Sequence, residues 1–146
     1  MNRGFLLLVV AAASVSAQTV PSSCELALTS VDRSLEKIGR TCNYRMAWDS
    51  YNAIENCRWY SGTMSMYNVE VCDPIVFDYM KCILKASGLL KVDGSFDDAA
   101  FQKTTLQDKC NSDVKFSTAY KLCKNSTMKY LNYYRFVWCL NGKLQL

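Results

Sequence analysis

The residues with the most definite chemistry in this chain are its eight cysteines, because no histidine occurs among its 146 residues. Serine–histidine–aspartate triads, cysteine–histidine dyads and histidine-ligated metal sites all need an imidazole, so the sequence excludes them. No spacing places two carboxylates together as a glycosidase requires. We therefore expect no enzyme activity. The cysteines are Cys24, Cys42, Cys57, Cys72, Cys82, Cys110, Cys123 and Cys139.

The spacing of these cysteines distinguishes disulfides from a zinc site. Structural zinc sites use cysteine pairs two to four residues apart, whereas the closest pair here is Cys72 and Cys82. We therefore predict four disulfides, no metal site and no cofactor.

If residues 112–124 form one helix, Cys110 and Cys123 lie about 18–20 Å apart, which is too far for a bridge. A following antiparallel helix would bring Cys139 back towards the start of this helix. We therefore expect Cys110 to pair with Cys139 and leave the other pairings open.

The first 17 residues have the pattern of a secretory signal peptide. Arg3 precedes a short apolar run over 5–13, and small residues end at Ala17. The alternative is a buried N-terminal helix. We predict cleavage after Ala17, leaving residues 18–146 as a single secreted, extracellular domain in which disulfides form. No later run is long enough to span a membrane. Asn125 begins a sequon for N-glycosylation.

The charge of the chain makes nucleic acid a poor partner. Removing Arg3 lowers the formal charge from +4 to +3, and the basic residues do not cluster.

The apolar spacing predicts an all-α fold of about six short helices braced by disulfides, with room for an apolar cavity. Ser22 and Glu25 are spaced as a capping box, and an apolar residue recurs every three or four positions up to Cys42. Further helices are expected over about 46–59, from Asp73-Pro74 to about 86, from Asp97 to Cys110, over about 112–124, and over about 128–141. Asp97 and Asp98 are interpreted as helix caps.

Part of the chain resembles a known family. Tyr79-Met80-Lys81-Cys82-Ile83-Leu84-Lys85 is followed by Gly88-Leu89-Leu90, by the turn Asp93-Gly94, and by Ala119-Tyr120-Lys121-Leu122 before Cys123. These segments resemble the insect odorant- and pheromone-binding proteins, which implies a helical carrier of small hydrophobic ligands. Asp78 stands where that family usually has a second cysteine, and Cys24 to Cys72 contain four cysteines where it commonly has one. The chain therefore resembles an atypical member, or a distant arthropod odorant-binding-like protein of saliva.

A weaker resemblance is to small helical, cysteine-rich antimicrobial proteins of ticks. We associate those proteins with copper chelation through histidines, which this chain lacks.

The aromatic and methionine side chains of the later helices are the candidate ligand contacts. Each could equally belong to an ordinary core, and Tyr120 or Tyr134 could supply a polar hydroxyl. We predict a secreted carrier that binds a small hydrophobic or amphipathic ligand. The alternative is a secreted defence or salivary protein that acts on a microbial or host factor through its surface. The candidates are Phe77, Met80, Phe101, Phe116, Tyr120, Tyr134 and Trp138.

Without histidine, ligand release has no ordinary switch between pH 5 and 8. A carboxyl with a raised pKa would be needed, and Asp78 is the candidate if it is buried. We therefore expect ligand affinity to change little in this range.

Overall fold

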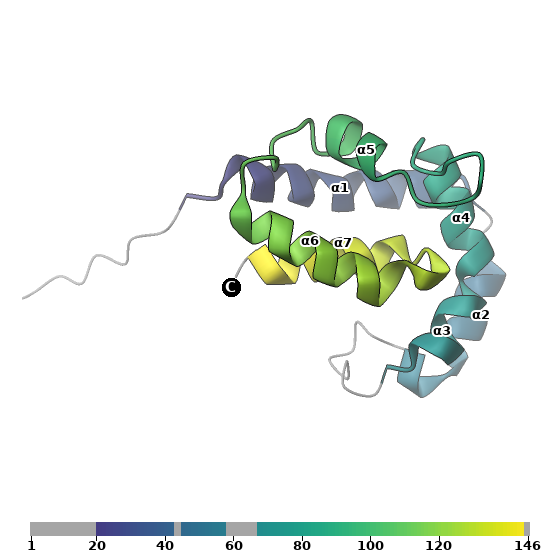
Figure 1. Cartoon of the computed structure of the whole chain (residues 1–146). Coiled ribbons are helices and arrows are strands. Elements are labelled where there is room, and N and C mark those ends of the chain that lie inside the picture. Colours follow the sequence, from purple (N-terminus) through teal and green to yellow (C-terminus); the bar gives the residue numbers. More distant parts are fainter. Residues whose placement is uncertain (1–19, 43–44, 58–66, 145–146) are drawn as a thin grey trace, which may run out of the picture.

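The computed structural model describes residues 20–42, 45–57 and 67–144 (Figure 1). Over these residues the protein is all-α, as predicted, and none of their helices is long and apolar enough to cross a membrane. The predicted signal peptide lies outside the described residues. The helices are α1 (Ser23–Gly39), α2 (Arg45–Ala53), η1 (Glu55–Cys57), α3 (Val69–Ile75), α4 (Phe77–Ala86), α5 (Asp98–Ala100), η4 (Phe101–Thr105), α6 (Val114–Thr127), η5 (Met128–Tyr130) and α7 (Tyr133–Leu144).

Helix α1 forms as the sequence predicts. The Ser22 hydroxyl accepts a hydrogen bond from the Glu25 amide at 3.2 Å, and the Glu25 carboxylate accepts one from the Ser22 amide at 2.5 Å. This capping box satisfies two amides at the start of the helix. The buried face includes Leu28, Val31 and Leu35, and the regular helix ends at Gly39, before Cys42.

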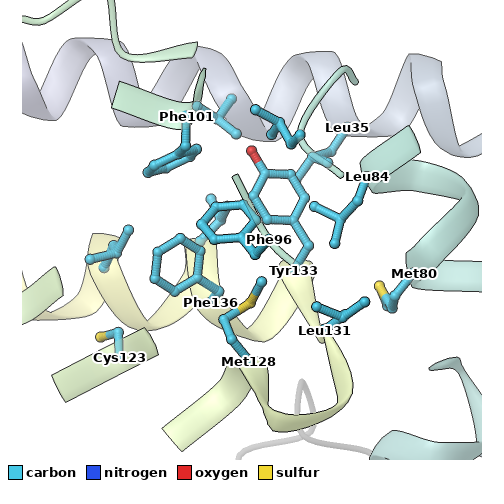
Figure 2. Close-up of a cluster of buried hydrophobic side chains, with 14 of the residues drawn as sticks. Leu35, Met80, Leu84, Phe96, Phe101, Cys123, Met128, Leu131, Tyr133 and Phe136 are labelled. Atoms are coloured by element: carbon cyan, nitrogen blue, oxygen red, sulfur yellow. The ribbon is translucent and has the colours of Figure 1, made fainter. Parts of the chain in front are cut away.

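The core lies between α1, α6 and α7, where aromatic side chains pack against one another (Figure 2). The ring of Phe136 lies 5.4 Å from Phe101, 5.6 Å from Phe96 and 5.4 Å from Tyr120, measured between centroids. Such distances are typical of directly packed rings. Side chains therefore fill this part of the interior, where the sequence analysis allowed for an apolar cavity.

The Asp73-Pro74 pair does not start a helix, contrary to the prediction. Helix α3 begins earlier, with the side chain of Asn68 accepting a hydrogen bond from the Glu70 amide. Pro74 lies near its C-terminal end, where the missing amide removes one helical bond, and a new helix, α4, begins at Phe77. Asp73 does not cap a helix because its carboxylate is buried and accepts hydrogen bonds from the side chains of Tyr67, Asn132 and Arg135.

Other boundaries also differ. Asp97 caps α5 as predicted, accepting from the Ala100 amide at 3.0 Å, but the chain then forms a π-helix, η4, and leaves helical geometry well before Cys110. Helix α6 is capped by Asp113 and continues through the sequon to Thr127. Helix α7 starts at Tyr133, five residues later than predicted, after η5 and a left-handed Leu131.

Four disulfides brace the helices, and all eight cysteines take part in them. The pairs are Cys24–Cys110, Cys42–Cys82, Cys57–Cys72 and Cys123–Cys139. The number of bridges was predicted, but the predicted pairing of Cys110 with Cys139 is wrong. Because α7 starts late, Cys139 is only about 9 Å along it, so it lies beside Cys123 rather than beside the start of α6.

One fully buried carboxylate joins α3 to the start of α7. Asp73 accepts hydrogen bonds from the Tyr67 hydroxyl at 2.5 Å, the Asn132 amide at 2.7 Å and the Arg135 guanidinium at 2.6 Å. Arg135 also stacks over the ring of Tyr67, 4.3 Å from its centroid. Tyr51 of α2 donates to the Tyr67 hydroxyl at 2.9 Å. This cluster, the Asp73 network, compensates the cost of burying the charge.

We expect Asp73→Asn to lower the free energy of unfolding by about 3 kcal/mol, because the mostly buried Arg135 loses its counter-charge while the side-chain shape is kept. Urea unfolding at neutral pH with the disulfides intact measures the change. Asp49→Asn removes an exposed carboxylate from α2 and should change the value by less than about 0.5 kcal/mol. Equal effects of the two substitutions would contradict the role given to Asp73.

Candidate functional site

The seven predicted ligand residues do not share one cavity. Met80 and Phe101 are core residues (Figure 2). Tyr134 borders one surface depression together with Trp48, and Phe77 borders a second beside the Asp93-Gly94 turn. Trp138, which is 44% exposed, borders a third, and only Phe116 and Tyr120 lie together in a fourth.

The depression that contains Phe116 and Tyr120 is a groove of about 560 Å³, open to solvent, which we call the α6 groove. A volume of this size accommodates a small organic molecule. Both aromatic residues are largely buried, and one helical turn separates them, so they present one apolar strip along α6. The groove is lined by Gln102, Cys110, Asn111, Phe116, Ser117, Tyr120, Lys121, Lys124 and Asn125.

The wall opposite α6 has unusual backbone geometry. In the π-helix η4, the Leu106 amide bonds to the carbonyl of Phe101, five residues back. Gln107 and Asp108 then both have positive φ, at 53° and 57°. π-Helical turns and left-handed non-glycine residues are uncommon, and both occur often at functional sites. Two of the three left-handed non-glycine residues in the described part of the chain thus lie close to the α6 groove, and the third is Leu131 in the turn before α7.

A disulfide holds this wall in place. Cys110 lines the groove and is bonded to Cys24 at the start of α1. The chain descends from η4 to the start of α6 beside that end of α1 (Figure 1). The side chain of Asn111 donates to the Asp108 carboxylate at 3.1 Å, which fixes the turn further. The Cys24–Cys110 bridge and the Asn111–Asp108 hydrogen bond therefore both restrain this wall of the groove.

An ion pair borders the α6 groove. The Asp98 carboxylate accepts hydrogen bonds from the Tyr120 hydroxyl at 2.5 Å and from the Lys124 ammonium at 2.7 Å. Burial alone would raise the pKa of Asp98, but the bonds from Lys124 and Tyr120 outweigh it and lower the pKa. Burial, and next the hydrogen bond to Asp98, raise the pKa of the Tyr120 phenol. Tyr120 therefore stays neutral and oriented.

Lysine side chains are the functional candidates that the sequence analysis missed. Lys121, which directly follows Tyr120, and Lys124, which lies one turn beyond it, both line the groove. Within the described part of the chain, Lys121 is exposed and forms no ion pair, whereas Lys124 pairs with Asp98. The signal in the sequence is the repeat of polar residues at 117, 121 and 124 beside aromatic residues at 116 and 120. The sequence analysis identifies Phe116 and Tyr120 as candidate ligand contacts but not the polar residues beside them.

Comparison of the chain with protein-family models, with curated proteins and with solved structures finds no match. The resemblance to odorant-binding proteins therefore depends on the sequence motifs alone and stays a prediction.

Asp98 should contribute to stability in a pH-dependent manner. Its pKa is lower in the folded protein than its ordinary value of 3.8, so its contribution is present above about pH 4 and is lost as the pH falls through the lowered pKa. The free energy of unfolding of the wild type should fall between about pH 4 and pH 2. It should fall less in Asp98→Asn, which has no carboxylate at this position to protonate. Urea unfolding across this range measures it, with Asp49→Asn as the charge-matched control. Identical pH profiles for Asp98→Asn and wild type would refute the assignment.

Proposed function

We propose that this protein is a carrier that binds a small amphipathic molecule in the α6 groove. The observation that carries the proposal is the composition of that groove, with an apolar strip formed by Phe116 and Tyr120 and a polar end formed by Lys121 and Asn125. Ligand sites are mostly concave and apolar with a few polar groups that fix orientation. The proposal moves the site from an internal cavity to a groove between η4 and α6.

The driving force is the removal of apolar surface from water. Burial contributes about 25 cal/mol per Å² of apolar surface before the costs of association. Because the Cys24–Cys110 bridge and the Asp98 hydrogen bonds hold the groove walls, little further ordering is needed when a ligand binds. Pre-organisation of this kind reduces the cost of binding.

We also propose that the chain is secreted and carries a glycan on Asn125. The four disulfides support an oxidising compartment. Asn125 is exposed in the last turn of α6 and lies at the rim of the groove. An atypical odorant-binding-like protein would have this kind of ligand and compartment.

Filling the groove tests the proposal directly. Ser117 is an exposed residue that lines the groove, so Ser117→Trp should occupy the space and weaken binding of the neutral probe N-phenyl-1-naphthylamine by about tenfold or more. Fluorescence titration measures the dissociation constant. Thr118→Trp adds the same side chain to the next exposed position of α6, which does not line the groove, and should bind the probe as wild type does.

Two outcomes would contradict the proposal. If the wild-type protein binds no probe, the carrier role fails, and the alternative of a defence or salivary protein acting through its surface is favoured. If Ser117→Trp and Thr118→Trp bind equally well, a site other than the α6 groove holds the ligand.

Probe affinity should stay nearly constant between about pH 7.5 and pH 5.5. The chain has no histidine, the pKa of Asp98 is lowered away from this range, and Asp78, the carboxyl suspected from the sequence, is exposed. Burial does raise the pKa of Asp32, but Asp32 bonds to Asn141 and does not line the groove. The same titration repeated across pH checks this, and a change of about tenfold would contradict it.

A further inference from the structure

We propose that the ligand of the α6 groove is an amphipathic anion, with a carboxylate headgroup between Lys121 and Lys124 and an apolar body against Phe116 and Tyr120. This inference depends on the proposed function and specifies the ligand class.

The charge of the groove lining favours an anion. The nine lining residues include two lysines and no carboxylate. The nearest acidic partner, Asp98, already accepts from Tyr120 and from Lys124, and it forms no bond to Lys121. Lys121 thus leaves a positive charge at the polar end of the groove without a counter-charge among the described residues.

The order of residues along α6 matches the shape of such a ligand. Lys121 and Lys124 are three residues apart, so their Cβ atoms lie about 5–6 Å from each other on one face of the helix. Two long, flexible side chains at this spacing can both donate to a single carboxylate. Phe116 precedes the lysines by about one to two turns, and Tyr120 lies between. An apolar chain would therefore extend from the headgroup past Tyr120 towards Phe116 and the start of α6.

The other depressions do not combine these properties. The depression beside Trp138 also contains a lysine, Lys143, but its other cation, Arg135, is bound to Asp73 and stacked on Tyr67. Arg135 and Lys143 are eight residues apart on α7, so they are not spaced to share one carboxylate as Lys121 and Lys124 are. In the depression beside Phe77, Lys129 pairs with Glu70, and the lining there includes carboxylates.

Three probes with the same ten-carbon chain separate headgroup charge from apolar burial: decanoate, 1-decanol and decyltrimethylammonium. Each is titrated below its micelle concentration against N-phenyl-1-naphthylamine at about pH 7. We expect decanoate to bind about tenfold more tightly than 1-decanol and the ammonium probe to bind most weakly. Lys121→Gln should abolish the preference, so that decanoate binds no more tightly than 1-decanol. Lys115→Gln, an exposed lysine of α6 outside the groove, should retain the preference.

The outcomes distinguish this inference from the proposed function. If 1-decanol binds as tightly as decanoate to the wild type, the anion inference is overturned while the carrier role stands. If no probe binds, both fail. If Lys115→Gln lowers decanoate binding as much as Lys121→Gln does, net charge alone explains the preference, and the placement of the headgroup is overturned.

Discussion

The position of helices α2 and α3 relative to helices α1, α6 and α7 depends on the buried carboxylate of Asp73. Helices α2 and α3 lie to one side of the layer formed by α1, α6 and α7 (Figure 1). The hydrogen bonds of Asp73 to Asn132 and Arg135 connect α3 to the first turn of α7. A buried charge of this kind is costly unless every lone pair has a donor. The Asp73 network therefore ties α3 to the start of α7 through directional bonds that apolar packing does not provide.

The same network explains where sequence reasoning failed. Asp-Pro usually marks a helix start, because the aspartate caps and the proline occupies the first turn. That reading assumes that the Asp73 carboxylate is free to accept from its own backbone, whereas here it accepts from Tyr67, Asn132 and Arg135. Local patterns predicted α1 because both capping bonds are made by residues three positions apart. Contacts between residues about sixty positions apart leave no such signal.

The position of the turn between α6 and α7 determines two of the disulfide pairings. Leu131, the left-handed residue of the turn, lies midway between Cys123 and Cys139 in sequence, so the two cysteines meet when the helices fold back. Exclusion of a Cys110–Cys123 bridge needed only the length of one helix and was right. To choose a partner for Cys110, the position of the turn between α6 and α7 had to be known. Residues Met128 to Tyr130 form a short 3-10 helix, so α7 starts five residues later than predicted. Cys110 is left to join α1, and that bridge holds one wall of the α6 groove.

The candidate site could be found only in part from the sequence, because core and groove use the same residue types. Phe101 and Phe116 have the same side chain and both are buried, yet the ring of Phe101 packs against Phe136 in the interior, whereas Phe116 lines the α6 groove. Aromatic side chains fill the interior, so we place the proposed ligand at the surface, in the groove between η4 and α6. The residues that distinguish this place are its charged ones. Tyr120 and Lys124 both bind Asp98, whereas Lys121 forms no ion pair with any described residue. In the proposed carrier, ligand selectivity would therefore depend on how charges are paired around Asp98, and burial of aromatic surface would supply the affinity common to all apolar ligands.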